Sequence, residues 1–212
     1  MSEVLIESRG AALPGDLALP VGAHGLVLFA HGSGSSRFSV RNRFVAEQLN
    51  GHGLATLLFD LLTPQEQVAD MATAALRFDI ALLTERLAGA ADWVHAQPAT
   101  AALPLGLFGA STGAAATLNV AAAKPALIGA VVSRGGRPDL ADALPLVKAP
   151  TLLIVGGLDQ GVLELNRTAA AALGGPHETA VVPGATHLFE EPGTLEQVAR
   201  LAGEWFVRHL KA

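Results

Sequence analysis

Residues 105–113 read LGLFGASTG, a short apolar run that ends in the pattern Gly-x-Ser-x-Gly and is followed at once by an Ala-rich run. The order strand, tight turn and helix predicts that the turn holds Ser111 strained and exposed at the carboxyl end of the strand. Gly109 and Gly113 suit such a turn because strand and helix approach each other closely there. With 23 Gly in the chain the pattern alone arises easily by chance. Its meaning therefore depends on whether a base and an acid follow.

The composition predicts one α/β domain over residues 1–212. The chain is 50% hydrophobic and 16% charged, which allows a large core. A net charge of -5 without a basic cluster argues against nucleic-acid binding. The absence of Cys excludes a thiol nucleophile and Cys-ligated metal. No secretory signal and no membrane-spanning apolar run are seen, so a cytoplasmic protein without membrane attachment is expected.

Apolar runs and helical periodicities alternate along most of the chain. Strands are predicted at residues 3–8, 16–19, 25–30, 54–59, 105–110, 127–132, 150–155 and 178–182. Helices are predicted at about 39–49, 79–97, 114–123 and 162–173, with a closing helix marked by Leu195, Val198, Leu201 and Trp205. A turn is expected at 13–15, and residues 61–76 read as part helix and part loop. This pattern predicts a doubly wound, mostly parallel sheet of about eight strands.

Polar residues follow several predicted strands directly, where ligands bind in such a sheet. Ser111, Asp159 and His187 occur in the order found on the α/β-hydrolase fold. An imidazole near its pKa can remove the serine proton, and a carboxylate can hold the ring in the useful tautomer. These three residues are the predicted catalytic triad.

Other acids and bases were weighed for the same roles. His177 should lie at the opposite sheet edge, and Asp139 and Asp142 compete with Asp159 because they follow the preceding strand. The remaining histidines fit surface loops or helix ends, namely His24, His52, His95 and His209. Glu190 and Glu191 read better as acids at a helix start.

The loop after the 25–30 strand is the predicted oxyanion loop. The backbone N–H groups of Ser33 and Thr112 would stabilise the oxyanion, and His31 would tie the loop by hydrogen bonds. The same loop contains Gly32-x-Gly34-x-x-Arg37, a degraded dinucleotide fingerprint in which Arg37 replaces the third glycine. Nucleotide binding is accordingly disfavoured, and no metal or cofactor is predicted.

The whole chain resembles a small α/β hydrolase, in the dienelactone-hydrolase-like branch. The residues that carry the resemblance are HGSGSSR at 31–37, GASTG at 109–113, SRGG at 133–136 and PGATH at 183–187. Similar domains are found fused to phosphoribosyltransferases. Dienelactone hydrolase uses Cys as nucleophile, whereas this chain has Ser111, so the resemblance implies a serine esterase. The short interval between Val132 and Pro150 leaves no room for a full cap domain.

The leading hypothesis is a cofactor-free hydrolase of small acyl esters or lactones, a monomer or homodimer. The alternatives are acyl transfer or perhydrolysis by the same triad, and a non-catalytic binding module on the same fold. Arg37 and Arg134 follow strands near Ser111, so each is a candidate for binding an anionic group of the substrate. The opposing interpretation is that each arginine only fixes its own loop.

Overall fold

The computed structural model describes residues 1–211. Its strands are β1 Ser2–Ser8, β2 Ala11–Ala18, β3 Leu26–Ala30, β4 Ala55–Phe59, β5 Leu105–Ala110, β6 Ile128–Arg134, β7 Thr151–Gly156 and β8 His177–Val182. Its α-helices are α1 Val40–Gly51, α2 Pro64–Thr73, α3 Ile80–Ala96, α4 Thr112–Ala123, α5 Gln160–Ala170 and α6 Thr194–His209. Short 3-10 helices are η1 Leu76–Phe78, η2 Pro138–Leu140 and η3 Leu144–Leu146.

The strands form one eight-stranded sheet in the order β1-β2-β4-β3-β5-β6-β7-β8. β1, β2 and β4 pair antiparallel, and every pair from β4 to β8 is parallel. The chain reverses its direction across the sheet at β3, which lies between β4 and β5. Ligands bind at such a switch point, outside the carboxyl ends of the strands. The predicted fold class is confirmed.

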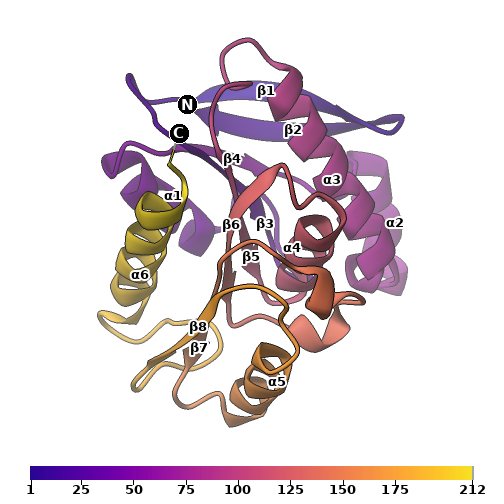
Figure 1. The fold of residues 1–212 in the computed structure, drawn as a ribbon. Helices are drawn as coiled ribbons and strands as arrows, with labels where there is room; N and C mark the ends of the chain where they lie inside the picture. The colour runs from indigo at the N-terminus through magenta and orange to yellow at the C-terminus, as the bar shows by residue number, and fades with distance from the viewer. Residues whose placement is uncertain (212) are drawn as a thin grey trace.

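Two layers of helices bury the two faces of the sheet (Figure 1). α1 and α6 pack together on one face over a core that includes Phe29, Phe108 and Phe206. α3 and α4 pack together on the other face over a core that includes Leu28 and Leu107. β3 and β5 are buried along their whole length because each faces both layers.

The predicted turn at residues 13–15 is wrong. β2 runs straight through these residues, and the hairpin turns at Arg9 and Gly10, whose φ angles are 47° and 83°. Two successive positive φ angles match the right-handed twist of a two-residue hairpin. Pro14 is tolerated because the ladder to β4 begins only at Gly15.

The ambiguous stretch at 61–76 contains α2 and ends at the first residue of η1. α2 begins with a capping box in which the Thr63 side chain accepts from the Glu66 N–H and the Glu66 carboxylate accepts from the Thr63 N–H. Pro64 occupies the first helical turn. The sequence TPQE therefore carried a helix-start signal that the periodicity did not reveal.

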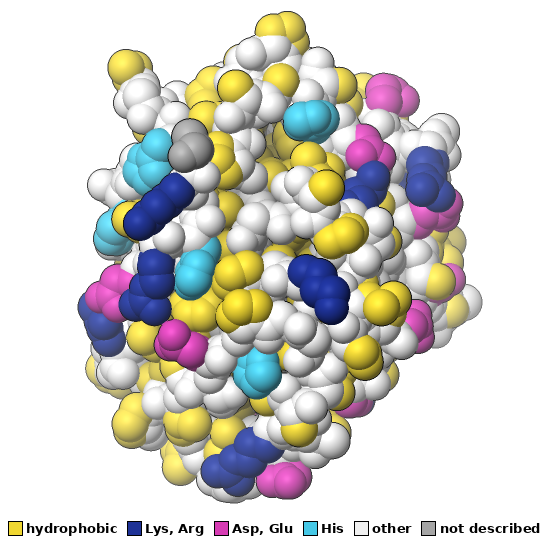
Figure 2. Space-filling view, viewed as in Figure 1, with side chains coloured by type: hydrophobic (Ala, Val, Ile, Leu, Met, Phe, Trp, Pro, Cys, Tyr) yellow, Lys and Arg dark blue, Asp and Glu magenta, His cyan; other side chains and the backbone are white. Residues whose placement is uncertain are grey.

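The segment between β6 and β7 holds only η2 and η3 among its described elements, so no cap domain is inserted there. No described helix is both long and apolar enough to span a membrane. On the face shown in Figure 2, the Lys and Arg side chains are dispersed rather than gathered in one patch.

Candidate active site

Ser111 occupies a sharp turn between β5 and α4. Its φ and ψ angles are 50° and -120°, a conformation that non-glycine residues rarely adopt. The backbone around it is held from β6 and the following loop, because the Ser111 N–H donates to the Arg134 carbonyl at 3.2 Å and the Ser111 carbonyl accepts from the Arg137 N–H at 3.0 Å. The elbow thus presents Ser111 at the switch point of the sheet.

The two glycines of the motif allow this elbow to form. A Cβ on Gly109 would lie 2.7 Å from the backbone nitrogen of Ala114, and one on Gly113 would lie 2.6 Å from the carbonyl oxygen of His31. Neither contact involves a flexible side chain that could move away. Strand, helix and the loop after β3 therefore approach so closely that only glycine fits at both positions.

His187 and Asp159 are joined by a hydrogen bond of 2.7 Å between His187 Nδ1 and Asp159 Oδ2. Asp159 lies in the turn after β7 and is the N-cap of α5, but its carboxylate accepts no hydrogen bond from the helix. Since Nδ1 faces the carboxylate, it carries the proton, and Nε2 is left as an acceptor. A histidine in this tautomer can accept a proton from a serine hydroxyl.

The turn after β8 fixes the position of His187. The Thr186 hydroxyl and N–H donate to the Glu191 carboxylate at 2.6 and 3.1 Å, and these hydrogen bonds lower the pKa of Glu191. A Cβ on Gly156 would lie 2.6 Å from the Thr186 carbonyl oxygen, so β7 approaches this turn closely. Gly135 lies against the imidazole on the other side, where a Cβ would be 3.5 Å from Nδ1.

A cavity of about 200 Å³ opens over the elbow, and both Ser111 and His187 line it. Within residues 1–211 no hydrogen bond joins the Ser111 hydroxyl to His187. Catalytic hydrogen bonds of this kind often form only when substrate is bound. The structure thus brings the predicted nucleophile, base and acid to one site.

The loop after β3 passes directly over Ser111. A Cβ on Gly32 would lie 3.1 Å from the Ser111 Cβ, so Gly32 permits the approach. Ser33 lines the cavity, and Thr112 begins α4 beside it. Within residues 1–211 neither the Ser33 N–H nor the Thr112 N–H has an acceptor. Two free donors near a helix N-terminus suit an oxyanion.

The His31 side chain connects the loop after β3 to Leu61, which follows β4. Its Nε2 accepts from the Leu61 N–H at 3.1 Å, so its Nδ1 carries the proton and donates to the Gly32 carbonyl at 3.0 Å. Burial lowers the pKa of His31, which keeps the ring neutral and both hydrogen bonds intact. His31 therefore fixes the loop and does not line the Ser111 cavity.

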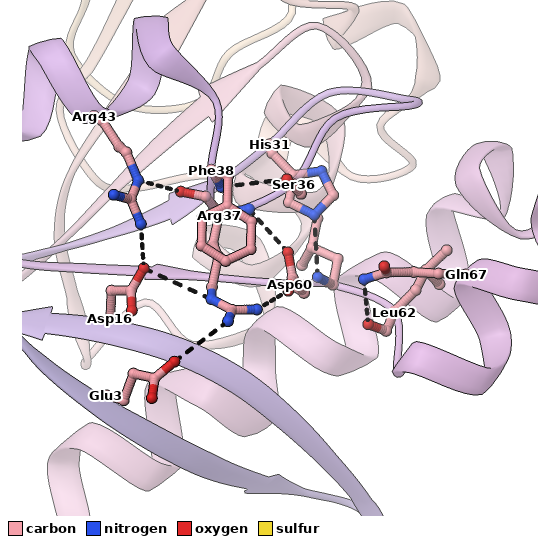
Figure 3. Close-up of polar contacts among 11 residues, drawn as sticks. Glu3, Asp16, His31, Ser36, Arg37, Phe38, Arg43, Asp60, Leu62 and Gln67 are labelled. Carbon is pink, nitrogen blue, oxygen red and sulfur yellow. Dashed lines mark hydrogen bonds and ion pairs between the residues drawn. The ribbon is translucent and has the colours of Figure 1, made fainter.

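Arg37 is surrounded by carboxylates (Figure 3) and does not line the Ser111 cavity. Its guanidinium pairs with Asp60, Asp16 and Glu3, and its backbone N–H donates to Asp60 at 2.8 Å. The Phe38 ring stacks on the same guanidinium, with 4.1 Å from its centroid to Cζ. The structure thus places Arg37 as an anchor that holds the loop after β3 against Asp16 of β2 and Asp60, which follows β4.

Replacing Arg37 with glutamine is expected to lower the free energy of unfolding by about 3 kcal/mol, because removal of one partner leaves a buried charge uncompensated. The side chain of Asp60 is only 4% exposed. The matched control is Arg9→Gln, which breaks an ion pair with Glu85 that is largely exposed and worth less than about 1 kcal/mol. Urea denaturation measures the unfolding free energy of both variants. Equal losses in Arg37→Gln and Arg9→Gln would show that the ion pairs of Arg37 do not hold the loop.

Arg134 ends β6 and lines the Ser111 cavity. It is 7% exposed, and its Nε and Nη1 atoms have no hydrogen-bond partner within the described residues. Burial, with a contribution from the charge of Arg41, lowers the pKa of Arg134 to about 10, so the side chain is still a cation at neutral pH. Arg41 lines the same cavity and donates to Glu190 at 3.1 Å. Two cations therefore line the cavity, and no described carboxylate lines it, since Glu190 binds Arg41 from outside.

Sequence reasoning missed Arg41. The residue lies in the first turn of α1, two positions after the N-cap Ser39. The signal that could have found Arg41 was its position just after the predicted oxyanion loop.

The two acids that compete with Asp159 lie elsewhere: Asp139 pairs with Arg137 at 2.7 Å, and the Asp142 N–H donates to the Asn119 side chain at 2.9 Å. Among the described residues no three His, Asp or Glu side chains cluster as metal ligands.

No family model matches this chain. Two curated proteins of Mycobacterium tuberculosis, from strains CDC 1551 and H37Rv, are each 60% identical to it over 98% of its residues. Their names propose a phosphoribosyl transferase. The chain covers 46% of each, so it spans about half the length of these relatives.

Solved structures resemble the chain over its whole length. A dienelactone hydrolase from Anabaena variabilis is 55% identical, with a TM-score of 0.98 over 99% of this chain and 98% of that one. Est1E from Butyrivibrio proteoclasticus is 16% identical, with a TM-score of 0.81 over 98% of each chain. A serine hydrolase without lid from Xanthomonas campestris is 22% identical, with a TM-score of 0.77 over 100% of this chain and 95% of that one. The last two share the fold, and the first shows in addition that this chain belongs to the α/β-hydrolase superfamily, in its dienelactone-hydrolase-like branch.

Proposed function

We propose that this chain is a serine hydrolase that cleaves carboxylic esters through an acyl-enzyme. The observation that carries the proposal is the strained elbow of Ser111, which shares a cavity with a histidine whose Nδ1 is held by Asp159 at 2.7 Å. A receptor has no need of all three groups. The phosphoribosyl transferase name belongs to proteins of which this chain spans only part, and nothing in this cavity resembles a phosphate loop.

The reaction proceeds in two steps. In the first, Ser111 Oγ bonds to the ester carbonyl carbon and its proton passes to His187 Nε2. The carbon–oxygen bond to the alcohol then breaks, and the alcohol leaves with that proton. In the second, water attacks the acyl carbon after losing a proton to His187, and the acid leaves as that proton returns to Ser111. The Ser33 and Thr112 N–H groups stabilise the oxyanion in both steps.

Arg134 binds an anionic group of the substrate in this proposal. Its unpartnered Nε and Nη1 atoms and its burial beside Ser111 support the role, because an unpaired buried guanidinium is stabilised by an incoming carboxylate. Arg37 lacks this freedom, since three carboxylates already surround its guanidinium. Of the two arginines considered from sequence, the proposal keeps Arg134 for the substrate and adds Arg41.

Arg134→Gln is expected to lower kcat/KM about 10-fold or more for an ester that carries a carboxylate on its alcohol part, because a charge-assisted hydrogen bond is lost. A matched neutral ester should be affected much less. Arg137→Gln is the control, since its guanidinium lies on the same loop and already binds Asp139. Equal losses for both esters in Arg134→Gln would show that Arg134 does not recognise substrate charge.

The site is also expected to favour short acyl groups. No cap is inserted over the site in the described chain, so no element is present there to enclose a long alkyl chain. In a series of p-nitrophenyl esters, kcat/KM should fall from acetate and butyrate to palmitate. A clear preference for palmitate would contradict this and would point to a lid formed by residues 61–76.

A further inference from the structure

A second cavity, of about 250 Å³, lies beside the first and shares part of its wall. Gly32, Ser33 and Ser35 line both cavities. The outer wall of the second cavity comes from the start and one face of α2, whereas no residue of α2 lines the Ser111 cavity. The two cavities therefore adjoin along the oxyanion loop, and we name the second one the α2 cavity.

The α2 cavity has an apolar floor. Leu61, Leu62 and Leu83 line it and are 0%, 6% and 2% exposed, so their apolar atoms form a fixed surface. Met71 lines it at the mouth and is 81% exposed. A flexible thioether at the mouth can adapt to different groups.

The two charged side chains and the imidazole of the α2 cavity already have hydrogen-bond partners. Asp70 accepts from the Leu76 N–H at 2.8 Å and from the backbone and side chain of Arg77, so the two opposite charges neutralise each other. His31 is neutral and makes two hydrogen bonds. Because no charge here lacks a partner, the cavity suits an uncharged apolar group, in contrast to the Ser111 cavity with Arg134.

The chemistry decides which part of the ester enters which compartment. His187 must give its proton to the leaving alcohol, so the alcohol part lies in the cavity that His187 lines. The carbonyl oxygen is held by the N–H of Ser33, which lines both compartments. The remaining substituent of the carbonyl carbon then points across the loop, away from His187.

We propose that the α2 cavity is the acyl pocket of this enzyme and takes a compact apolar acyl group of about the size of an aromatic ring. The inference rests on the proposed ester hydrolysis and assigns opposite parts of the substrate to the two compartments. Its volume supports the size, because an apolar cavity of roughly 150 Å³ is known to hold benzene. The acyl group remains in this pocket after the alcohol has left, so its fit affects both steps.

The proposal is tested by substituting residues of α2 with tryptophan so that the indole occupies the pocket. Gln67 lines the cavity, and Gln67→Trp places an indole in it without altering the buried leucines. Val68→Trp is the matched control, because Val68 lies on the same helix, is 70% exposed and does not line the cavity. The substrates are p-nitrophenyl benzoate and p-nitrophenyl acetate, which share one leaving group and differ only in the acyl part.

Gln67→Trp is expected to lower the ratio of kcat/KM for benzoate over acetate at least about 10-fold relative to the wild type. Val68→Trp should leave the ratio unchanged. Met71→Trp, a second variant at the exposed mouth, should shift the ratio in the same direction even if Gln67→Trp proves unstable by thermal unfolding. Across aryl acetates with leaving groups of different size, none of the three variants should change the order of reactivity.

An unchanged benzoate-to-acetate ratio in Gln67→Trp and Met71→Trp overturns the acyl pocket while leaving ester hydrolysis intact. A shift that follows the size of the leaving group overturns the assignment of the two compartments. If the wild type hydrolyses neither ester and Ser111 resists a fluorophosphonate, the proposed function itself fails and the acyl pocket falls with it.

Discussion

Ser111→Ala is expected to lower kcat for p-nitrophenyl acetate by about 10⁴-fold or more, because removal of a triad nucleophile leaves only binding and oxyanion stabilisation. The variant should fold as the wild type does. Alanine and serine share the same backbone penalty at a φ of 50°, so the strain of the elbow is unchanged. The measurement combines steady-state kinetics with the thermal unfolding midpoint.

Ser2→Ala is the matched control for that loss. Ser2 is exposed on β1 and lines neither of the two cavities beside the elbow. Activity close to that of the wild type is expected. If Ser111→Ala keeps its turnover, the nucleophile lies elsewhere.

Asp159→Asn should lower kcat by about 10⁴-fold, the effect expected when the histidine of a triad takes the wrong tautomer. An asparagine amide can donate to His187 Nδ1 across the present 2.7 Å contact, which moves the imidazole proton to Nε2. A protonated Nε2 cannot accept the serine proton. The loss should appear in kcat at neutral pH, with little change in the fold.

Asp139→Asn is the comparison that separates the two candidate acids. The carboxylate of Asp139 binds Arg137 through two hydrogen bonds of 2.7 and 2.8 Å. Turnover should therefore survive this substitution. A loss at Asp139 as large as that at Asp159 would show that the acid of the triad has been misassigned.

Much of this architecture could be predicted from local sequence signals. Buried parallel strands such as β3 and β5 read as continuous apolar runs, because both of their faces are covered. The helix start at Ser39 follows from capping chemistry, since its side chain accepts from the N–H of Asn42. Once strands and helices alternate, the residues that follow the strands must meet at one edge of the sheet.

Other features depend on partners that are distant in sequence. In the sequence both Arg37 and Arg134 come after predicted strands near the elbow. Only the fold shows that Arg37 meets Asp60, whereas Nε and Nη1 of Arg134 have no hydrogen-bond partner among residues 1–211. Sequence spacing could not distinguish the two. The hairpin at Arg9 was missed for a different reason: Pro14 and Gly15 suggested a turn, but pairing with β1 on one side and β4 on the other held them in β2.

The two compartments together suggest a substrate with a charged alcohol part and a compact apolar acyl part. Arg134 and the α2 cavity would then act at different stages, since the acyl group alone persists in the acyl-enzyme. Substitution of Arg134 is expected to change how kcat/KM depends on the charge of the alcohol part. Substitutions in the α2 cavity are expected to change how kcat/KM depends on the shape of the acyl group. Additivity of the two effects is expected because the residues share no contact.

Covalent labelling with a fluorophosphonate tests the activated nucleophile most directly. Peptide mass mapping of the wild type should place one adduct on Ser111, Asp159→Asn should be labelled far more slowly, and Ser111→Ala should stay unlabelled. An adduct on another serine, or labelling of Asp159→Asn at the wild-type rate, would contradict the triad of Ser111, His187 and Asp159.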